Sequence, residues 1–204
     1  MLKIRKISSI SELDSLPALE LNNWQWTCKT RPETRAHLAW IEGEGIAVKF
    51  HIEEKSPKME SQTPLTHVHE DSAVELFLSM TGEEKPGLSS MYLNFEANAA
   101  PVLYACTGAG RKGREKISPE EYELCKISSK IEEDFWEVSF LVPLSVLKRV
   151  CNISGLREGD CLWLNLYKLS EDEALEHYAS YSKVELESPN FHRPDFFIKA
   201  VLDE

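Results

Sequence analysis

Aromatic and short polar side chains are interleaved along residues 165–197, NLYKLSEDEALEHYASYSKVELESPNFHRPDFF. The apolar C–H face of a pyranose stacks on an aromatic ring, and its hydroxyls form directed hydrogen bonds with polar groups. This segment therefore has the side-chain chemistry of a sugar site. The alternative is that the aromatics fill a sandwich core and that Arg193 is a surface charge, because clustered aromatics are usually buried. The candidate residues are Tyr167, His177, Tyr178, Tyr181, Phe191, His192 and Arg193.

Two strand-like segments, AVELFLSM and MYLNFEAN, carry polar side chains on one face. Side chains alternate between the two faces of a strand, so Asn94, Glu96 and Asn98 share one side of theirs. Glu75 lies on the same face of its strand as a bulky phenylalanine. Such a stripe either meets water or floors a concave surface where amides and carboxylates receive several hydroxyls.

The segment THVHEDSAVE contains two histidines beside two carboxylates. His67 and His69 stand at i and i+2, but no third ligand follows at a recognisable spacing, so a transition-metal site is weakly supported. Glu70 and Asp71 offer oxygen ligands that suit calcium, or they are loop residues that bond to nearby backbone.

Glu75 and Glu96 are the pair of carboxylates that could act as acid and nucleophile in glycoside hydrolysis. The sequence contains no G-x-S-x-G, no phosphate-binding glycine loop and no HExxH motif. The run GAGRKG at 108–113 lacks the strand–turn–helix setting of a phosphate loop. We expect a mobile, solvated loop there, with exposed Arg111, Lys112 and Arg114.

The elements that must position these side chains are predominantly strands, because apolar residues alternate with period two in most segments. An EGEG turn joins the first pair as a hairpin. We expect an all-β fold, an antiparallel jelly-roll or immunoglobulin-like β-sandwich with short connecting helices, formed by residues 1–204 as one domain. The expected strands are 35–41, 46–52, 73–80, 91–98, 102–106, 124–131, 135–142, 161–169 and 196–202, and the expected helices are 11–16 and 144–150, the latter started by Pro143.

Composition limits the partners. The chain has 204 residues and a formal net charge of −11, which argues against nucleic acid and anionic membranes and is compatible with a neutral ligand or a divalent cation. The N-terminus has no signal-peptide core, and no apolar run reaches the length of a membrane span. Five scattered cysteines predict free, mostly buried thiols, so the chain as given is expected in the cytoplasm. A periplasmic or secreted location applies if a signal sequence was removed.

From about residue 35 to the end, the chain resembles family 9 carbohydrate-binding modules, particularly the single-domain branch related to DOMON domains. The motifs that carry the resemblance, in order, are RAHLAWI, IAVKFHI, HEDSAVELFL, YLNFEANA, WEVSFLVPL, LWLNLYK, HYASYS and PNFHRPDFF. The resemblance implies a β-sandwich that binds glucose-, xylose- or cello-type sugars, often at the reducing end, without catalysis. Some members hold structural calcium, so that ion is left open here, and no other cofactor is expected.

In the best understood branch of that family, two tryptophans sandwich the sugar while a carboxylate, amides and guanidinium groups bind its hydroxyls. The carboxylate falls on Glu75, and the polar strand positions fall on Asn94 and Glu96. The two tryptophan positions are occupied here by His69 and Phe191, which stack less well than indole. With their neighbours His192 and Arg193, these residues form the expected sugar-binding set.

The leading hypothesis is therefore a non-catalytic carbohydrate-binding protein that recognises a mono- or oligosaccharide, or a glycan end, on a concave sheet face. A second hypothesis is a glycan-processing enzyme or its accessory domain, with Glu75 and Glu96 as its carboxylates. A third is a DOMON-type haem binder that uses His67, His69 or His177, since histidine commonly ligates haem iron. The sequence does not specify the sugar, a partner enzyme or the oligomeric state.

Overall fold

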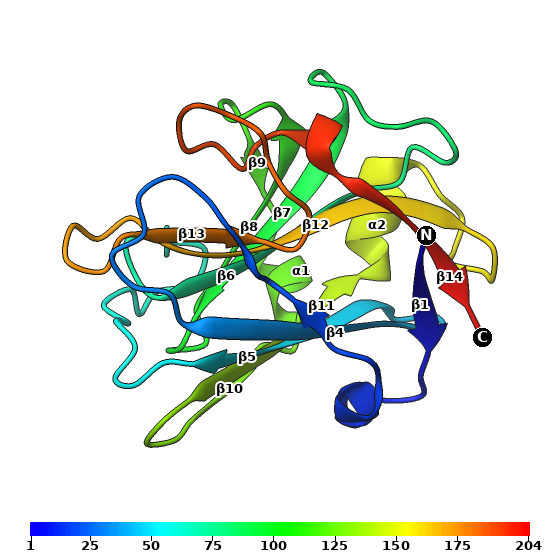
Figure 1. The fold of residues 1–204 in the computed structure, drawn as a ribbon. Helices are drawn as coiled ribbons and strands as arrows, with labels where there is room; N and C mark the ends of the chain where they lie inside the picture. Colours follow the sequence, from blue (N-terminus) through cyan, green and yellow to red (C-terminus); the bar gives the residue numbers. More distant parts are fainter.

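The computed structural model describes residues 1–204 and consists mainly of strands with short helical connections (Figure 1). The helical segments are the 3-10 turns η1 (Ile10–Ser15) and η2 (Pro194–Phe196) and the α-helices α1 (Pro119–Glu123) and α2 (Leu144–Cys151). The strands are β1 (Leu2–Lys6), β2 (Leu19–Glu20), β3 (Asn23–Trp24), β4 (Glu33–Ile41), β5 (Gly45–Glu53), β6 (Ala73–Ser79), β7 (Met91–Asn98), β8 (Leu103–Ala109), β9 (Glu115–Lys116), β10 (Ser128–Ile131), β11 (Trp136–Pro143), β12 (Cys161–Ser170), β13 (His177–Ser180) and β14 (Ile198–Asp203).

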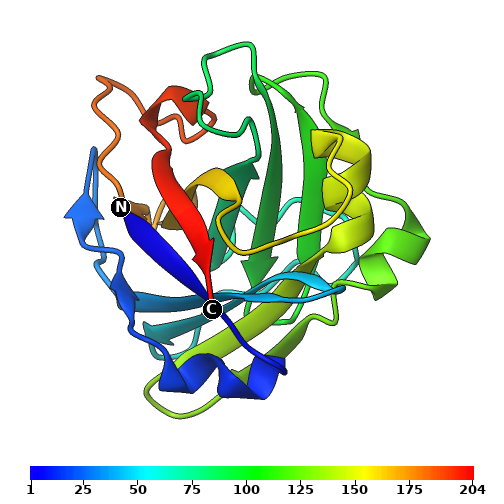
Figure 2. The same ribbon diagram turned by 90° about the vertical axis from the view of Figure 1, so that its right-hand side faces the viewer.

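The strands form one continuous, curled sheet whose two halves face each other (Figure 2). One half runs β10–β11–β5–β4 and the other runs β14–β12–β6–β7–β8–β9, with β13 paired to β12 and β3. Strand β1 joins the halves because it pairs with both β4 and β14. Both of these pairings are parallel, whereas all the other strand pairs are antiparallel. The predicted sandwich is confirmed, with β1 as a parallel exception.

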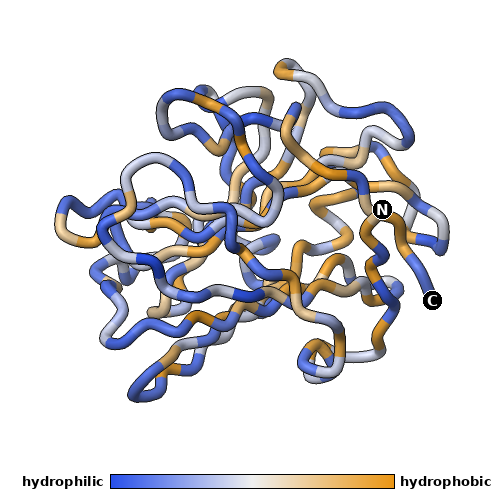
Figure 3. Tube along the Cα trace, in the orientation of Figure 1, coloured by the Kyte–Doolittle hydropathy of each residue, from blue (hydrophilic) through white to orange (hydrophobic).

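Apolar side chains from both halves meet in the interior, and the hydrophilic stretches of the chain lie mainly in the loops (Figure 3). Phe140 of β11 stacks on Phe50 of β5 at 6.3 Å and on Phe95 of β7 at 6.1 Å between ring centroids. The inward positions of β6 and β7 therefore alternate with outward ones, as the period-two pattern predicted. Glu75, Asn94 and Glu96 occupy outward positions.

A second, smaller aromatic cluster covers the outer face of β6, β7 and β12. It includes Phe77, Tyr92 and Tyr167 from the strands and Phe191 from the segment that crosses over them. Aromatics of residues 165–197 thus fill this outer cluster. The alternative that these rings are buried by packing therefore holds for Tyr167, which is fully buried, and largely for Phe191, which is nearly buried.

Two local predictions need correction. Residues 124–127 are not strand, because Ser118 and Glu121 form a capping box that starts α1 and its terminal turn occupies this region. The strand predicted for 196–202 begins only at Ile198, because Pro194–Phe196 form the turn η2. The helix predicted for 144–150 after Pro143 is confirmed as α2, and Pro143 ends β11 opposite Gly45 directly before it.

Candidate functional site

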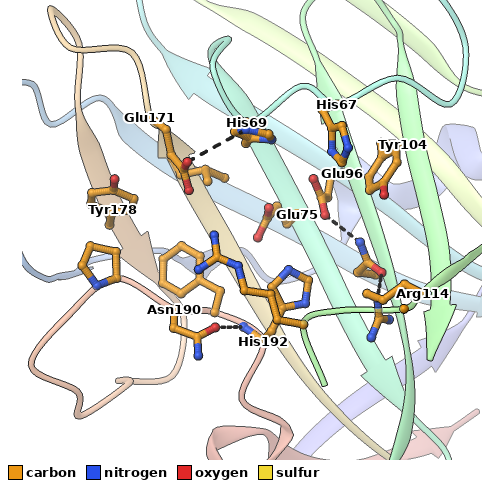
Figure 4. A pocket seen from close by; sticks show the side chains of 16 residues that line it. His67, His69, Glu75, Glu96, Tyr104, Arg114, Glu171, Tyr178, Asn190 and His192 are labelled. Atoms are coloured by element: carbon orange, nitrogen blue, oxygen red, sulfur yellow. Dashed lines mark hydrogen bonds and ion pairs between the residues drawn. The ribbon is translucent and has the colours of Figure 1, made fainter. Parts of the chain in front are cut away.

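A cavity of about 340 Å³ opens on the outer face of β6, β7 and β8, beside the aromatic cluster (Figure 4). Its volume lies at the lower end of the range typical of small-ligand sites. Its floor comes from the outward positions of the strands, and three loops supply the walls: the turn before β6, the segment after β8, and residues 189–192.

Glu75 and Glu96 form the centre of the floor. They are directly paired across β6 and β7, and both residues are nearly buried, with 4% and 5% of their surface exposed. Glu75 Oε2 is buried without a hydrogen-bond partner. Burial, followed by the charge of Glu96, raises the pKa of Glu75 well above its usual value. Burial also raises the pKa of Glu96, to about 7.

Asn94 and Arg114 extend this floor into a hydrogen-bonded chain. Arg114 Nε donates to Asn94 Oδ1 at 2.7 Å, and Asn94 Nδ2 donates to Glu96 Oε1 at 2.6 Å. The remaining bonds of the guanidinium go to backbone carbonyls of Tyr92, Gly108 and Gly110, and its Cζ lies 3.9 Å from the centroid of the Tyr92 ring. The prediction of a solvated side chain is therefore wrong for Arg114.

One wall of the cavity carries imidazole and phenol rings. The His67 ring lies 4.4 Å from the Tyr104 ring, centroid to centroid, and 5.3 Å from that of His69. His69 Nε2 lies 4.0 Å from a carboxylate oxygen of Glu171, which follows β12. Burial and the neighbouring His69 lower the pKa of His67, which favours a neutral ring that can donate or accept a hydrogen bond.

Phe191 and His192 form the opposite wall. Phe191 stacks on Tyr167 and also packs against Trp26, at a centroid distance of 5.4 Å, so little of its surface remains exposed to the cavity. His192 Nδ1 lies 2.8 Å from Tyr92 Oη. Burial lowers the pKa of His192 to about 3, so its imidazole is neutral at physiological pH.

Six of the seven residues predicted for the sugar site line this cavity: His69, Glu75, Asn94, Glu96, Phe191 and His192. Arg193 does not. Its guanidinium forms a bidentate pair with Asp195, at 2.6 and 2.8 Å, and lies over the ring of Phe196. The nearby acid therefore holds Arg193 away from the cavity, as the surface-charge alternative stated.

The cavity also contains residues that sequence reasoning did not select, among them Tyr104, Arg114 and Glu171. Tyr104 could have been found, because it alternates with core-facing Leu103 and Ala105 on β8 and pairs with Glu96 in register. Nothing in the sequence indicates that Arg114, in a glycine-rich loop, folds back onto a strand.

The arrangement of the histidines and carboxylates bears on the metal and haem hypotheses. No group of three or more His, Cys, Asp or Glu side chains is arranged to hold a metal ion. Asp71 accepts from the backbone N–H groups of Glu60 and Ser61 and from Asn98 Nδ2, at 2.8 to 3.0 Å, which matches the prediction that it bonds to nearby backbone. His177 is engaged at both ring nitrogens, by Thr30 and Leu175 on one side and by Lys168 on the other, so it is not free to bind iron.

A β-sandwich with a cavity of this kind on its outer sheet face, floored by carboxyl and amide groups and walled by rings, belongs to the class of small-ligand binding modules. The sequence specifies the family. Residues 11–202 match Carbohydrate-binding family 9, and the chain belongs to that family. Both the predicted membership and the predicted carbohydrate-binding function are confirmed.

Solved structures with the same fold agree with this assignment. A proposed carbohydrate-binding protein from Bacteroides uniformis ATCC 8492 is 25% identical, with a TM-score of 0.85 over 99% of this chain and 98% of that one. A family 9 module from Caldicellulosiruptor kristjanssonii is 13% identical. Its complex with cellotriose gives a TM-score of 0.70 over 98% of this chain and 92% of that one. Its complex with glucose gives 0.68 over 99% and 95%.

No curated protein sequence matches the chain. No helix in the structure has both the length and the apolar character needed to cross a membrane.

Proposed function

We propose that the chain is a single non-catalytic module that binds a monosaccharide, or the terminal unit of an oligosaccharide, in the cavity over β6, β7 and β8. The observation that carries this proposal is the floor of Glu75, Asn94 and Glu96, three hydrogen-bonding side chains gathered in a walled space. The structural neighbour that binds cellotriose and glucose supports a sugar of the gluco or cello type. The ligand is neutral and is neither nucleic acid nor membrane, in keeping with the net charge of −11.

The rings around the floor supply the stacking surface. The neighbouring His67 and Tyr104 rings, tilted by 38° to each other, offer one side, and Phe191 offers the other. None of these is an indole, so stacking contributes less than it would between two tryptophans. We expect dissociation constants on the order of micromolar to millimolar, which correspond to roughly 4–8 kcal/mol.

Titration calorimetry against a panel of mono- and disaccharides tests the proposal. Asn94→Ala should weaken binding of the best ligand by about 0.5–1.5 kcal/mol, the range for a hydrogen bond between neutral groups. Arg193→Ala is the matched control, because Arg193 adjoins His192 in sequence but lies outside the cavity. Failure of every sugar in the panel to bind the folded protein would refute the proposed site.

The paired carboxyls of Glu75 and Glu96 keep the enzymatic alternative open to test, because raised pKa values suit a general acid. We expect no hydrolysis of aryl glycosides. An activity that disappears in Glu75→Gln or Glu96→Gln would establish an enzyme instead of a binding module.

A further inference from the structure

The carboxyl of Glu75 lies in surroundings that do not support a negative charge. Oε2 is buried and has no hydrogen-bond donor, and none of the ion pairs in the protein includes Glu75. An ionised carboxylate removed from water needs donors or a counter-charge, and without them it takes up a proton. Glu75 lacks such donors even though other polar side chains line the cavity.

Glu96 is in the opposite situation, although it lies directly beside Glu75 in the sheet. A guanidinium has only donors, so Arg114 fixes the oxygen of the Asn94 amide toward itself. The Asn94 Nδ2 group must then point to Glu96, whose Oε1 is consequently an acceptor. One of the two N–H bonds of Asn94 remains for another partner.

Two adjacent buried carboxyls cannot both ionise without strong repulsion. When the pair holds a single proton, that proton belongs on Glu75, because Glu96 already receives a hydrogen bond and Glu75 receives none. The other groups that act on Glu75 do not reverse this order. Glu171 raises its pKa further, and the exposed Arg111 lowers it only as the last of the four contributions.

The remaining neighbours supply no charge that would ionise Glu75. Tyr167, on the adjacent strand, is fully buried, and burial raises the pKa of its phenol well above the usual value. His192 in the facing segment is neutral. His69, on the loop before β6, lies within reach of Glu171 and not of Glu75.

We propose that Glu75 acts in the sugar site as a neutral carboxylic acid that donates a hydrogen bond to a sugar oxygen, while Glu96 accepts one as the carboxylate. This inference rests on the proposed function and names the roles of its two central residues. The floor then offers, side by side, the acid O–H of Glu75, an amide N–H of Asn94 and an acceptor oxygen of Glu96. Two adjacent hydroxyls of a neutral sugar match this set, since one accepts from Glu75 and Asn94 while its neighbour donates to Glu96.

A neutral Glu75 beside a charged Glu96 also determines which sugars would bind poorly. A uronic acid would bring a second carboxylate beside that of Glu96. An amino sugar would satisfy Glu75 only if its ammonium displaced the proton, so its binding would release a proton to the buffer. A neutral sugar should bind without such release, and its affinity should fall as pH rises and Glu75 ionises.

The isosteric variants Glu75→Gln and Glu96→Gln test which of the two carboxyls is the neutral donor and which is the charged acceptor. At neutral pH, Glu75→Gln should weaken binding of the best neutral sugar less than Glu96→Gln does, because an amide remains a neutral donor. Glu96→Gln should lose at least about tenfold, because it removes the carboxylate that accepts from the sugar and from Asn94. The reverse order, a large loss in Glu75→Gln and little change in Glu96→Gln, would show that Glu75 is the charged acceptor and overturn the proposal.

A measurement without sugar keeps the inference distinct from the proposed function. Infrared spectra of the ligand-free protein, recorded above the pH at which free glutamate ionises, should contain the C=O stretch of a protonated carboxyl, and that band should be absent from Glu75→Gln. If the variant fails to fold, ¹³C chemical shifts of the glutamate carboxyls in the wild-type protein provide the same titration. Loss of all sugar binding with the band present would refute the proposed function alone, whereas absence of a protonated carboxyl would refute the role of Glu75.

Discussion

The rings of Phe191 and Tyr167 lie face to face, with centroids 4.1 Å apart and planes within 16° of parallel. Phe191 belongs to the segment that crosses the sheet, and Tyr167 to the central strand β12. The contact therefore fastens a wall of the cavity to the sheet beside its floor, and the Phe191 ring serves both the packing and the site.

Phe191→Ala should accordingly lower both stability and affinity. The residue is nearly buried in the outer aromatic cluster, so we expect a loss of about 3–5 kcal/mol of unfolding free energy in urea titrations. Phe191→Leu, which keeps most of the volume, should recover the larger part of that loss. A variant with unchanged stability would show that Phe191 only contacts the ligand.

Arg114→Lys should weaken sugar binding more than it weakens the fold. Lysine keeps the charge but lacks the planar fork that bonds Asn94 and three backbone carbonyls together. Without this restraint the Asn94 amide can rotate, and we expect affinity to fall at least about tenfold. Lys112→Ala, an exposed change in the same loop, is the control and should bind as the wild type does. Equal affinity in Arg114→Lys would show that Asn94 is oriented by other contacts.

Stability should fall as pH rises because of Glu75, and Glu75→Gln should remove part of that fall. The pKa of Glu75 is higher in the folded protein than in the unfolded chain, so the folded state holds more protons above the unfolded pKa near 4.5. The free energy of unfolding then decreases with rising pH until the folded pKa is passed. We expect Glu75→Gln to melt near the wild type at pH 4 and at a higher temperature at pH 8. Equal melting temperatures at pH 8 would contradict a raised pKa.

Asp71→Ala should release the loop that leads to His67 and His69. Asp71 is buried and accepts three hydrogen bonds, two of them from backbone N–H groups of that loop. Loss of hydrogen bonds to a charged group costs about 1.5–3 kcal/mol, measured as unfolding free energy. The exposed neighbour is the control, since Glu70→Ala should be neutral. Addition of a chelator should leave the melting temperature unchanged, because both carboxylate oxygens of Asp71 are already bonded, and a fall would indicate a structural cation.

Period-two alternation made much of this architecture predictable. It placed Asn94 and Glu96 on one face of their strand, because strand geometry alone fixes the direction of each side chain. That Glu75 lies beside them follows from the pairing of β6 with β7. The same reasoning would have selected Tyr104.

Other features depend on contacts between distant parts of the chain. Arg114 is oriented by strand β7, twenty residues away in sequence, through a loop in which Gly108, Gly110 and Gly113 all have positive φ. For Arg193 the sequence left two alternatives open, a sugar contact or a surface charge, and its bonds to Asp195 favour the second. The parallel pairing of β1 with β14 joins opposite ends of the chain, which no local pattern encodes.

That terminal pairing has a mechanical consequence. Leu2 lies beside Ala200 and Arg5 beside Asp203, so the first and last strands run in the same direction. Opposed tension on the two ends of the chain would slide β1 along β14 and load their hydrogen bonds simultaneously in shear, whereas an antiparallel terminal pair would unzip one bond at a time. A module tethered through both ends would thus resist extension at this pair, whereas its ligand cavity lies over β6, β7 and β8, with which neither terminal strand pairs.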